Sequence, residues 1–178
     1  FMAKDSVFRH PIAGPLMRGM KHIPVDRHDG SVAFETAVAA ARAGELIGVF
    51  PEATMSRSLE IKELKNGAVR MAREAEVPLI PMIVFGGHRV LSYDVRDFTR
   101  GRTICMTIGR PISTNDDVDE MTDALRSTLS ELLDETIHRY PDKQPGAPWI
   151  PQRHGGSAPS LEEAARIEER RRAAREPK

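Results

Sequence analysis

Residues 46–50 read LIGVF, and residues 51–58, directly after them, read PEATMSRS. A short continuous apolar run of this kind is typical of a strand that is buried on both faces. The residues after it predict a polar turn that presents carboxylate, hydroxyl and guanidinium groups together. Because ligands of open α/β sheets bind beyond the carboxyl ends of strands, this turn is the first candidate for a functional site. The residues alone also allow an ordinary solvated turn.

Strand and helix patterns alternate along the rest of the chain. The patterns predict further strands at residues 1–3, 22–26, 79–85 and 103–108, and helices at residues 11–20, 32–43, 65–76 and 115–140. Ser31 is the expected N-cap of the second helix. The alternation predicts an α/β fold, with a mixed, largely parallel sheet covered by helices on both faces.

The composition changes at Pro141, and this change predicts three parts. Residues 1–140 form the main domain, residues 141–159 a Pro/Gly-rich extension, and residues 160–178 a charged helix or a disordered tail. Trp149 is expected to anchor the extension to the domain. Ser160 and Glu163 match a capping box at the start of the last helix. That helix has almost no apolar face, so we expect it to be solvated.

Composition excludes several classes of protein. The 178 residues carry 26 basic and 26 acidic side chains, so no global basic field favours nucleic acid. The single cysteine, Cys105, lies in an apolar strand pattern and is expected to be an inert core thiol. The sequence has no P-loop, no G-x-S-x-G and no metal-ligand spacing, so we expect no metal and no cofactor. No apolar run approaches the roughly 18 residues of a membrane span.

Cationic side chains follow three of the predicted strands. Lys4, Arg27 and Arg57 each stand at or just after a strand end. Neighbouring strands lie about 5 Å apart, so these side chains could converge on one anion pocket. Arginine suits phosphate because its fork donates two parallel hydrogen bonds. For Arg27, which follows Asp26, an ordinary surface ion pair is the other interpretation.

Several stretches, in this order, resemble the conserved blocks of the PlsC-like lysophospholipid acyltransferase family, the 1-acylglycerol-3-phosphate acyltransferases. Residues 1–14 with 23–27 (IPVDR) resemble the second block, and residues 50–58 (FPEATMSRS) resemble the third, usually F-P-E-G-T followed by R-S. Residues 77–82 (VPLIPM) resemble the fourth. The resemblance covers residues 1 to about 115. Residues 147–151 (APWIP) are similar to extensions of actinobacterial members.

The resemblance implies the glycerolipid acyltransferase fold and transfer of an acyl group from acyl-CoA or acyl carrier protein to a lysophospholipid, most directly lysophosphatidate. It implies a peripheral protein at the cytoplasmic face of the membrane. Arg27 and Arg57 would bind the acceptor phosphate, and Glu52 and Thr54 would shape the acyl-transfer site, with residues 78–81 as part of the acyl-chain wall. The implied substrate-binding set is Lys4, Arg27, Glu52, Ala53, Thr54, Arg57 and Ser58. Ala53 replaces the usual glycine, so we expect the turn or the approach of the substrate to differ there.

The family's first block, a His and an Asp separated by four residues, has no counterpart in this sequence. None of the six histidines has Asp five positions later; they are His10, His22, His28, His88, His138 and His154. We therefore expect the His-x4-Asp dyad, which would supply the general base, upstream of Phe1. We also expect that residues 1–178 alone are inactive. The alternative is a non-catalytic lipid- or phosphate-binding relative without the dyad, and the upstream genomic sequence would distinguish the two.

Overall fold

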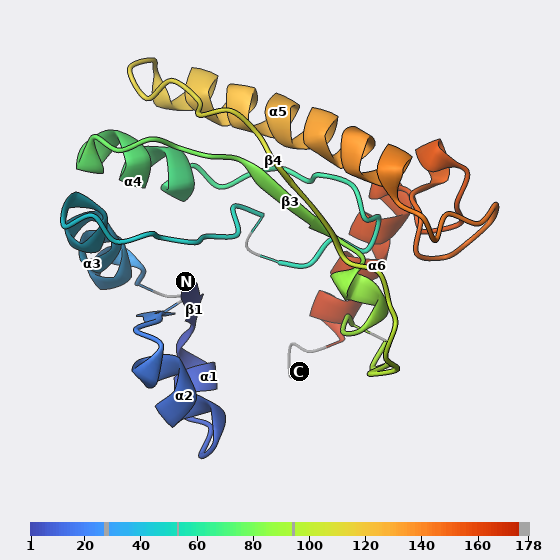
Figure 1. Cartoon of the computed structure of the whole chain (residues 1–178). Helices are drawn as coiled ribbons and strands as arrows, with labels where there is room; N and C mark the ends of the chain where they lie inside the picture. The colour runs from blue at the N-terminus through green and yellow to red at the C-terminus, as the bar shows by residue number, and fades with distance from the viewer. Residues whose placement is uncertain (27–28, 53, 94, 175–178) are drawn as a thin grey trace. The chain divides into compact units, whose positions relative to one another are not determined.

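The computed structural model describes residues 1–26, 29–52, 54–93 and 95–174 (Figure 1). By their contacts, these residues divide into two compact units. Unit 1 comprises Phe1–Ala53, Lys65–Leu79 and Pro111–Asp123, and unit 2 comprises Thr54–Leu64, Ile80–Arg110 and Ala124–Lys178. The mixed α/β class is confirmed. The described strands form one parallel and one antiparallel pair, rather than the largely parallel sheet that we expected. The three-part division at residues 140 and 159 stays a prediction.

In unit 1, strands β1 (Met2–Lys4) and β2 (Ile23–Val25) pair in parallel, with Lys4 opposite Val25. Helices α1 (Asp5–Phe8) and α2 (Ala13–Gly19) connect them, which confirms both predicted strands and the first helix. Gly14 is required here because a Cβ at this position would lie 2.2 Å from the carbonyl oxygen of Phe8. The two short helices can therefore approach closely only with glycine at their contact.

Helices α3 (Ser31–Arg42) and α4 (Gly67–Ala75) pack together as the core of unit 1. Apolar residues at helical spacing form the contact. The buried cluster comprises Ile23, Ala33, Ala37, Val38, Met71 and Ala75. The predicted N-cap at Ser31 is wrong, since Gly30 occupies the cap position. Asp29 Oδ1 instead accepts from the Ser31 hydroxyl at 2.6 Å and the Ser31 amide at 3.0 Å. These two bonds lower the pKa of Asp29.

The segment at residues 46–50 is not the doubly buried strand that its composition predicts. It has no strand assignment, and Leu46 is 95% and Phe50 72% exposed. Ile47 and Val49 pack against the unit 1 core, so only one face of this run is covered. A single backbone bond, from Met2 N–H to Gly48 O at 3.0 Å, connects it to β1. The Phe1 ring occupies the space beside Gly48 where a side chain would otherwise lie.

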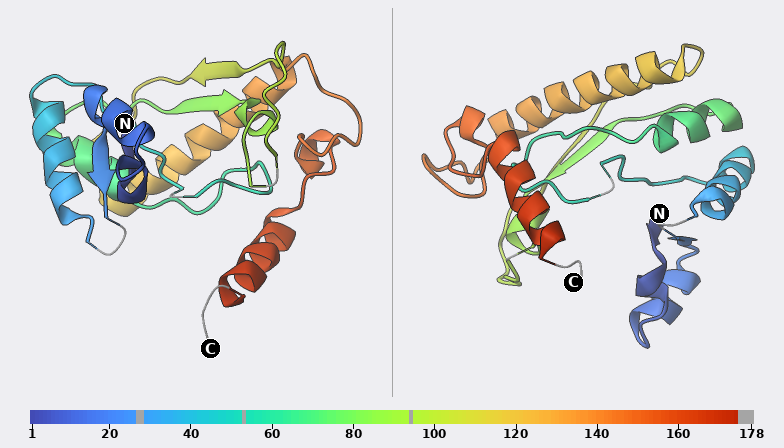
Figure 2. Two further views of the ribbon diagram at one scale, coloured as in Figure 1. Left: turned by 90° about the horizontal axis from the view of Figure 1, so that it is seen from below. Right: turned by 180° about the vertical axis from the view of Figure 1, so that it is seen from behind.

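In unit 2, strands β3 (Met82–Phe85) and β4 (Cys105–Ile108) pair antiparallel, and the unit 2 part of helix α5 (Val118–Arg139) covers one of their faces (Figures 1 and 2). The strand at residues 79–85 is shorter than predicted, because Pro81 lacks the N–H that a ladder needs. It is also buried on one face only: Ile83 and Phe85 are buried, whereas Met82 and Val84 are exposed. Cys105 is half-buried in β4 rather than in the core. Apolar residues at helical spacing form the buried face of α5: Met121, Leu125, Leu129, Leu132 and Leu133.

The C-terminal tail, residues 141–173, is ordered against unit 2. Its one short 3-10 turn, η2 (Gln152–His154), was not predicted, and Ile150 beside it is buried. Helix α6 (Leu161–Ala173) begins with the predicted capping box. Ser160 N–H donates to Glu163 Oε2 at 2.8 Å, and Glu163 N–H donates to Ser160 Oγ at 3.2 Å. The helix is less solvated than predicted, because Ala164 is buried.

Candidate substrate-binding site

The polar segment after residue 50 is a loop whose ends are held together. Residues 51–64 contain no helix or strand among their described positions, and Lys65 N–H donates to Pro51 O at 2.9 Å. Glu52 is half-buried near the start of this loop. Ala53 lies outside the described residues, so the effect of alanine in place of glycine stays a prediction. The part of the loop that belongs to unit 2, residues 54–64, is called the substrate loop below.

Ser58 supports the substrate loop from inside. It is fully buried, and its Oγ lies 2.8 Å from Ser56 Oγ. The same oxygen accepts from Glu60 N–H at 3.3 Å. Side-chain to backbone bonds of this kind shape turns without regular structure. Ser58 therefore has the contacts of a loop-stabilising residue, and its predicted role in substrate binding remains a prediction.

Arg57 rests on the ring of Tyr93. Its Cζ lies 4.1 Å from the ring centroid, and the side chain is half-buried. Such a cation–π contact attracts the guanidinium to the face of the ring and limits its movement. The contact therefore helps to hold the guanidinium group in place. The sequence analysis missed Tyr93, because nothing local links it to a residue 36 positions earlier.

Thr54 and Lys62 are joined across the substrate loop. Lys62 Nζ donates to Thr54 Oγ1 at 2.9 Å, and also contacts both carboxylate oxygens of Glu168, at 3.0 and 3.2 Å. Thr54 itself is exposed. Sequence reasoning singled out Thr54 but missed Lys62 and Glu168. A lysine in a loop and a glutamate in a charged helix have no local pattern that distinguishes them from solvated side chains.

The other predicted cations are only partly described. Lys4 is exposed at the end of β1, and β1 and β2 end side by side, as predicted. Arg27 lies outside the described residues. Lys4 belongs to unit 1 and Arg57 to unit 2. Convergence of Lys4, Arg27 and Arg57 on one pocket therefore stays a prediction.

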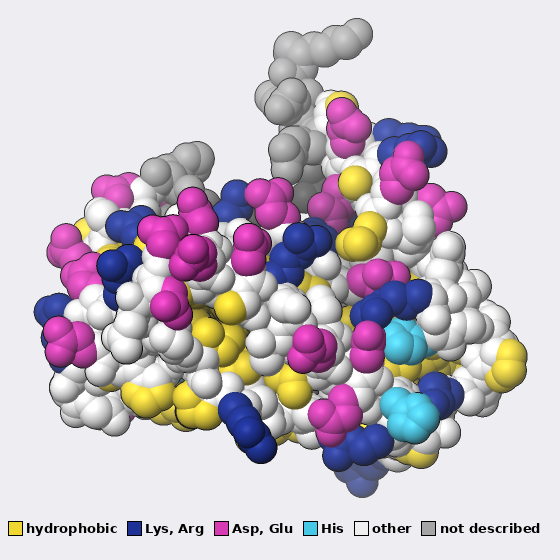
Figure 3. Space-filling view, turned by 90° about the horizontal axis from the view of Figure 1, so that it is seen from above, with side chains coloured by type: hydrophobic (Ala, Val, Ile, Leu, Met, Phe, Trp, Pro, Cys, Tyr) yellow, Lys and Arg dark blue, Asp and Glu magenta, His cyan; other side chains and the backbone are white. Residues whose placement is uncertain are grey.

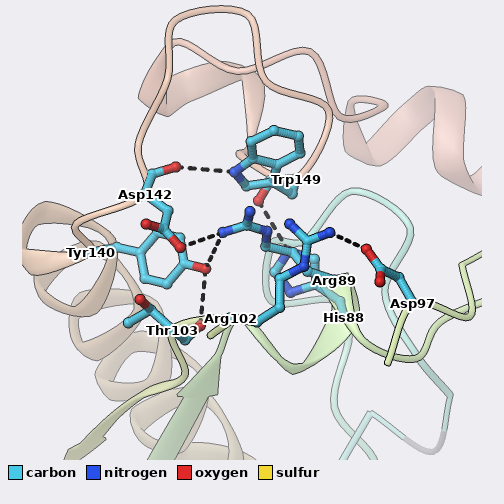
Figure 4. A network of polar contacts seen from close by, with 8 residues as sticks. All are labelled: His88, Arg89, Asp97, Arg102, Thr103, Tyr140, Asp142 and Trp149. Atoms are coloured by element: carbon cyan, nitrogen blue, oxygen red, sulfur yellow. Dashed lines mark hydrogen bonds and ion pairs between the residues drawn. The ribbon is translucent and has the colours of Figure 1, made fainter. Parts of the chain in front are cut away.

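A separate polar network fixes the tail to the body of unit 2 (Figure 4). Arg89, in the 3-10 turn η1 (Gly87–Arg89), donates to Tyr140 Oη at 2.9 Å and Asp142 Oδ2 at 2.6 Å, and its Cζ lies 4.5 Å from the centre of the Trp149 ring system. Trp149 Nε1 donates to Asp142 O at 3.1 Å, and its carbonyl oxygen contacts His88 Nε2 at 3.0 Å. Burial lowers the pKa of His88. These internal bonds confirm the predicted anchor at Trp149 and give His88 a structural role.

Asp97 and Arg102 form a second pair in the same region. Hydrogen bonds from Thr99, its hydroxyl first and then its amide, together with Arg102, lower the pKa of Asp97 to about 2. The carboxylate is therefore ionised at neutral pH and closes the loop between η1 and β4. That loop also carries Tyr93, the residue beneath Arg57.

Charge on the surface is mixed. On the face drawn in Figure 3, Lys and Arg side chains lie among Asp and Glu side chains, in line with the zero net charge. Within the described ranges, no three or more His, Cys, Asp and Glu residues are grouped so that they could hold a metal ion. A search of the described helices for one long and apolar enough to cross a bilayer finds none.

Comparison with known proteins finds related sequences and one related structure. A family model described as Acyltransferase matches residues 1–85. A protein of Bacillus subtilis named 1-acyl-sn-glycerol-3-phosphate acyltransferase is 30% identical over 141 residues, which are 74% of this chain and 67% of that protein. A protein of the same name from Limnanthes douglasii is 31% identical over 132 residues, 70% of this chain and 46% of that protein.

A structural relative is PlsC, the 1-acyl-sn-glycerophosphate (LPA) acyltransferase of Thermotoga maritima, whose crystal structure is known. It matches with a TM-score of 0.67 and 20% identity, over 79% of this chain and 57% of that one. At this identity the match shows a shared fold. The chain thus spans about two thirds of the Bacillus relative and about half of the Limnanthes and Thermotoga proteins.

Proposed function

Because the chain belongs to the acyltransferase family, we propose that it is part of a 1-acylglycerol-3-phosphate O-acyltransferase. The lysophosphatidate hydroxyl attacks the thioester carbonyl of acyl-CoA or acyl-acyl carrier protein. A C–O bond forms, the C–S bond breaks, and the hydroxyl proton leaves with the thiol. The thioester provides the driving force, so the reaction needs no cofactor. The names of the sequence relatives support this substrate assignment.

The observation that carries the proposal is that Arg57, which lies in the segment resembling the family's third block, has its guanidinium held over the ring of Tyr93. A fixed fork of N–H donors suits a phosphate monoester, which offers pairs of oxygens at matching separation. We assign Arg57 and Arg27 to the acceptor phosphate, with Lys4 as a further cation. Glu52, Ala53, Thr54 and Ser58 complete the substrate-binding set, and Glu52 supports the acyl-transfer site.

Proton removal from the acceptor hydroxyl requires a base that residues 1–178 do not supply in the family's pattern, since no histidine is followed by Asp five positions later. We assign this role to a His-x4-Asp dyad upstream of Phe1. The same observation favours the second candidate, a lipid- or phosphate-binding relative without catalysis. Acyl transfer by the protein with its native N-terminal sequence would exclude this second candidate.

The acceptor is a bilayer lipid, so the protein must reach a membrane surface. Helix α2 and its flanks expose three apolar side chains, Ile12, Leu16 and Met20, at 79%, 60% and 50%. Basic Arg18 and Lys21 lie in the same segment, and cationic side chains favour anionic lipid. We propose peripheral attachment at the cytoplasmic face of the membrane.

The decisive experiment compares Arg57→Ala with Arg73→Ala in the protein with its native N-terminus. Arg73 is an exposed arginine on α4 and is the matched control. Losing a charge-assisted bidentate contact should lower kcat/KM for lysophosphatidate by about 10- to 100-fold. Monoacylglycerol, which lacks the phosphate, should be a poor acceptor that Arg57→Ala does not worsen. Unchanged kcat/KM for lysophosphatidate would remove Arg57 from the site.

A further inference from the structure

Lys62 and Glu168 are 106 positions apart in the chain, and their side chains form an ion pair at 3.0 Å. Their side chains are only 19% and 31% exposed, so the pair is partly removed from water. Partly buried pairs are screened less than surface pairs and hold a more defined geometry. Lys62 lies in the substrate loop and Glu168 on α6, so this pair connects the tail to the loop.

A second contact connects the same two parts. Arg153, in the η2 turn of the tail, lies 3.5 Å from Glu60 Oε2 in the substrate loop and donates to Asp134 Oδ2 of α5 at 2.9 Å. His154 Nε2 contacts Asp134 Oδ1 at 3.0 Å. The side chain of Glu60 is 17% exposed. The tail is therefore fixed to α5 and to the substrate loop at once.

We propose that the C-terminal tail is a strap that holds the substrate loop, and that Lys62 is a positioning residue of the acceptor site. The role of Lys62 rests on the proposed function, because it acts through Thr54. The strap itself rests only on two contacts between the tail and the loop, Glu168 with Lys62 and Arg153 with Glu60.

The chemistry of Lys62 gives Thr54 a defined orientation. An ammonium group only donates, so Thr54 Oγ1 accepts from it. The single hydroxyl proton of Thr54 then points away from Lys62 and can donate to an oxygen of the acceptor. Glu168 balances the charge of Lys62 and holds its ammonium group at the tail.

The rate at which thermolysin cleaves the folded protein before Leu59 and Ile61 measures how often the substrate loop opens, and this measurement needs no ligand. Lys62→Met and Glu168→Ala should each accelerate this cleavage by about three- to tenfold, because local opening becomes easier. The matched controls Lys65→Met and Glu169→Ala change exposed side chains and should leave the cleavage rate unchanged. Equal rates in all four variants would refute the strap.

A charge swap separates the strap from the orientation of Thr54. The double variant Lys62→Glu with Glu168→Lys restores the ion pair and should restore slow cleavage. A carboxylate at position 62 accepts the proton of the Thr54 hydroxyl, whereas the native lysine donates to the Thr54 oxygen. In this double variant, KM for lysophosphatidate should therefore be about three- to tenfold above that of the unaltered protein, with kcat nearly unchanged. These kinetics require the protein with its native N-terminus.

The outcomes distinguish the two ideas. If the swap fails to restore slow cleavage, the contact is not a simple ion-pair strap and the inference is overturned. If cleavage responds as expected but KM responds in none of the variants, the strap stands and the positioning role of Lys62 fails. If Arg57→Ala also leaves kcat/KM unchanged, the proposed function of the loop fails with it.

Discussion

Thr136→Val should destabilise unit 2 more than Thr107→Val, although each change replaces one hydroxyl with a methyl group. Thr136 is 0% and Thr107 7% exposed, and their Oγ1 atoms lie 2.6 Å apart. Thr136 Oγ1 donates its proton to Leu132 O at 2.6 Å. Because a hydroxyl has one proton, Thr107 must be the donor to Thr136. Thr107 therefore needs Thr136 as its acceptor, whereas Thr136 keeps its bond to Leu132 O without Thr107.

The magnitudes follow from which partner is left unsatisfied. Thr136→Val leaves the buried proton of Thr107 without its acceptor, at a cost of about 1–3 kcal/mol. Thr107→Val leaves Thr136 bonded to Leu132 and releases Arg139, which donates to Thr107 at 2.8 Å but is half exposed. Water can replace that bond, so the cost should be about 0.5–1.5 kcal/mol. The double variant should cost no more than Thr136→Val alone, since no orphaned donor remains.

Urea denaturation of the four proteins measures these differences, with the double-mutant cycle giving the coupling. The expected coupling is about 1 kcal/mol in the direction that makes the double change cheaper than the sum. Equal costs for the two single variants, or an additive double variant, would show that the donor assignment is wrong.

Two further predictions concern stability. Glu76 ends α4 in a left-handed conformation at φ 56°, with Val77 N–H donating to Ala72 O at 3.0 Å, so Glu76→Gly should raise the free energy of unfolding by about 0.5–1 kcal/mol. Glu74→Gly, inside the same helix, should lower it by about 1 kcal/mol, and urea midpoints for both variants check the contrast. Burial holds the pKa of His88 below its ordinary 6.5, so the unfolded chain binds the proton more readily and stability should fall as the pH drops through 6.5. His88→Gln should lack this loss between pH 7.5 and 5.5, and an equal slope in both proteins would contradict the assignment.

Local patterns predicted the longer helices and most strands but missed the four-residue helix α1, because each prediction depends on residues a few positions apart. The helix predicted at residues 65–76 is α4, and its residues Ala68, Met71, Ala72 and Ala75, at helical spacing, are all buried. The same reasoning failed for residues 46–50. An apolar run indicates that a segment is buried on at least one face. Whether one face or both are buried depends on distant residues, here Phe1 and the α3–α4 core.

The candidate site was also predictable only in part from the sequence. The loop after residue 50 could be proposed as a site because its polar residue types stand together, whereas the roles of Arg57 and Thr54 came from the resemblance of this loop to the family's third block. Tyr93, Lys62 and Glu168 could not, since each acts through a partner far along the chain. Three-dimensional contact, and not residue type, marks them as supports of the site.

The strap also explains how a partly exposed ion pair can matter. An isolated pair of this kind contributes roughly 0–1 kcal/mol, largely because two long side chains must be ordered. Glu168 does not start from a free chain: Trp149 and Arg153 already fix the tail, and the burial of Ala164 orients α6. Each earlier contact raises the effective concentration of the carboxylate at Lys62, so the last contact forms at a small entropic cost. The capping box of α6 should therefore help to hold the substrate loop in place, although the two bonds of the box join Ser160 and Glu163 only to each other.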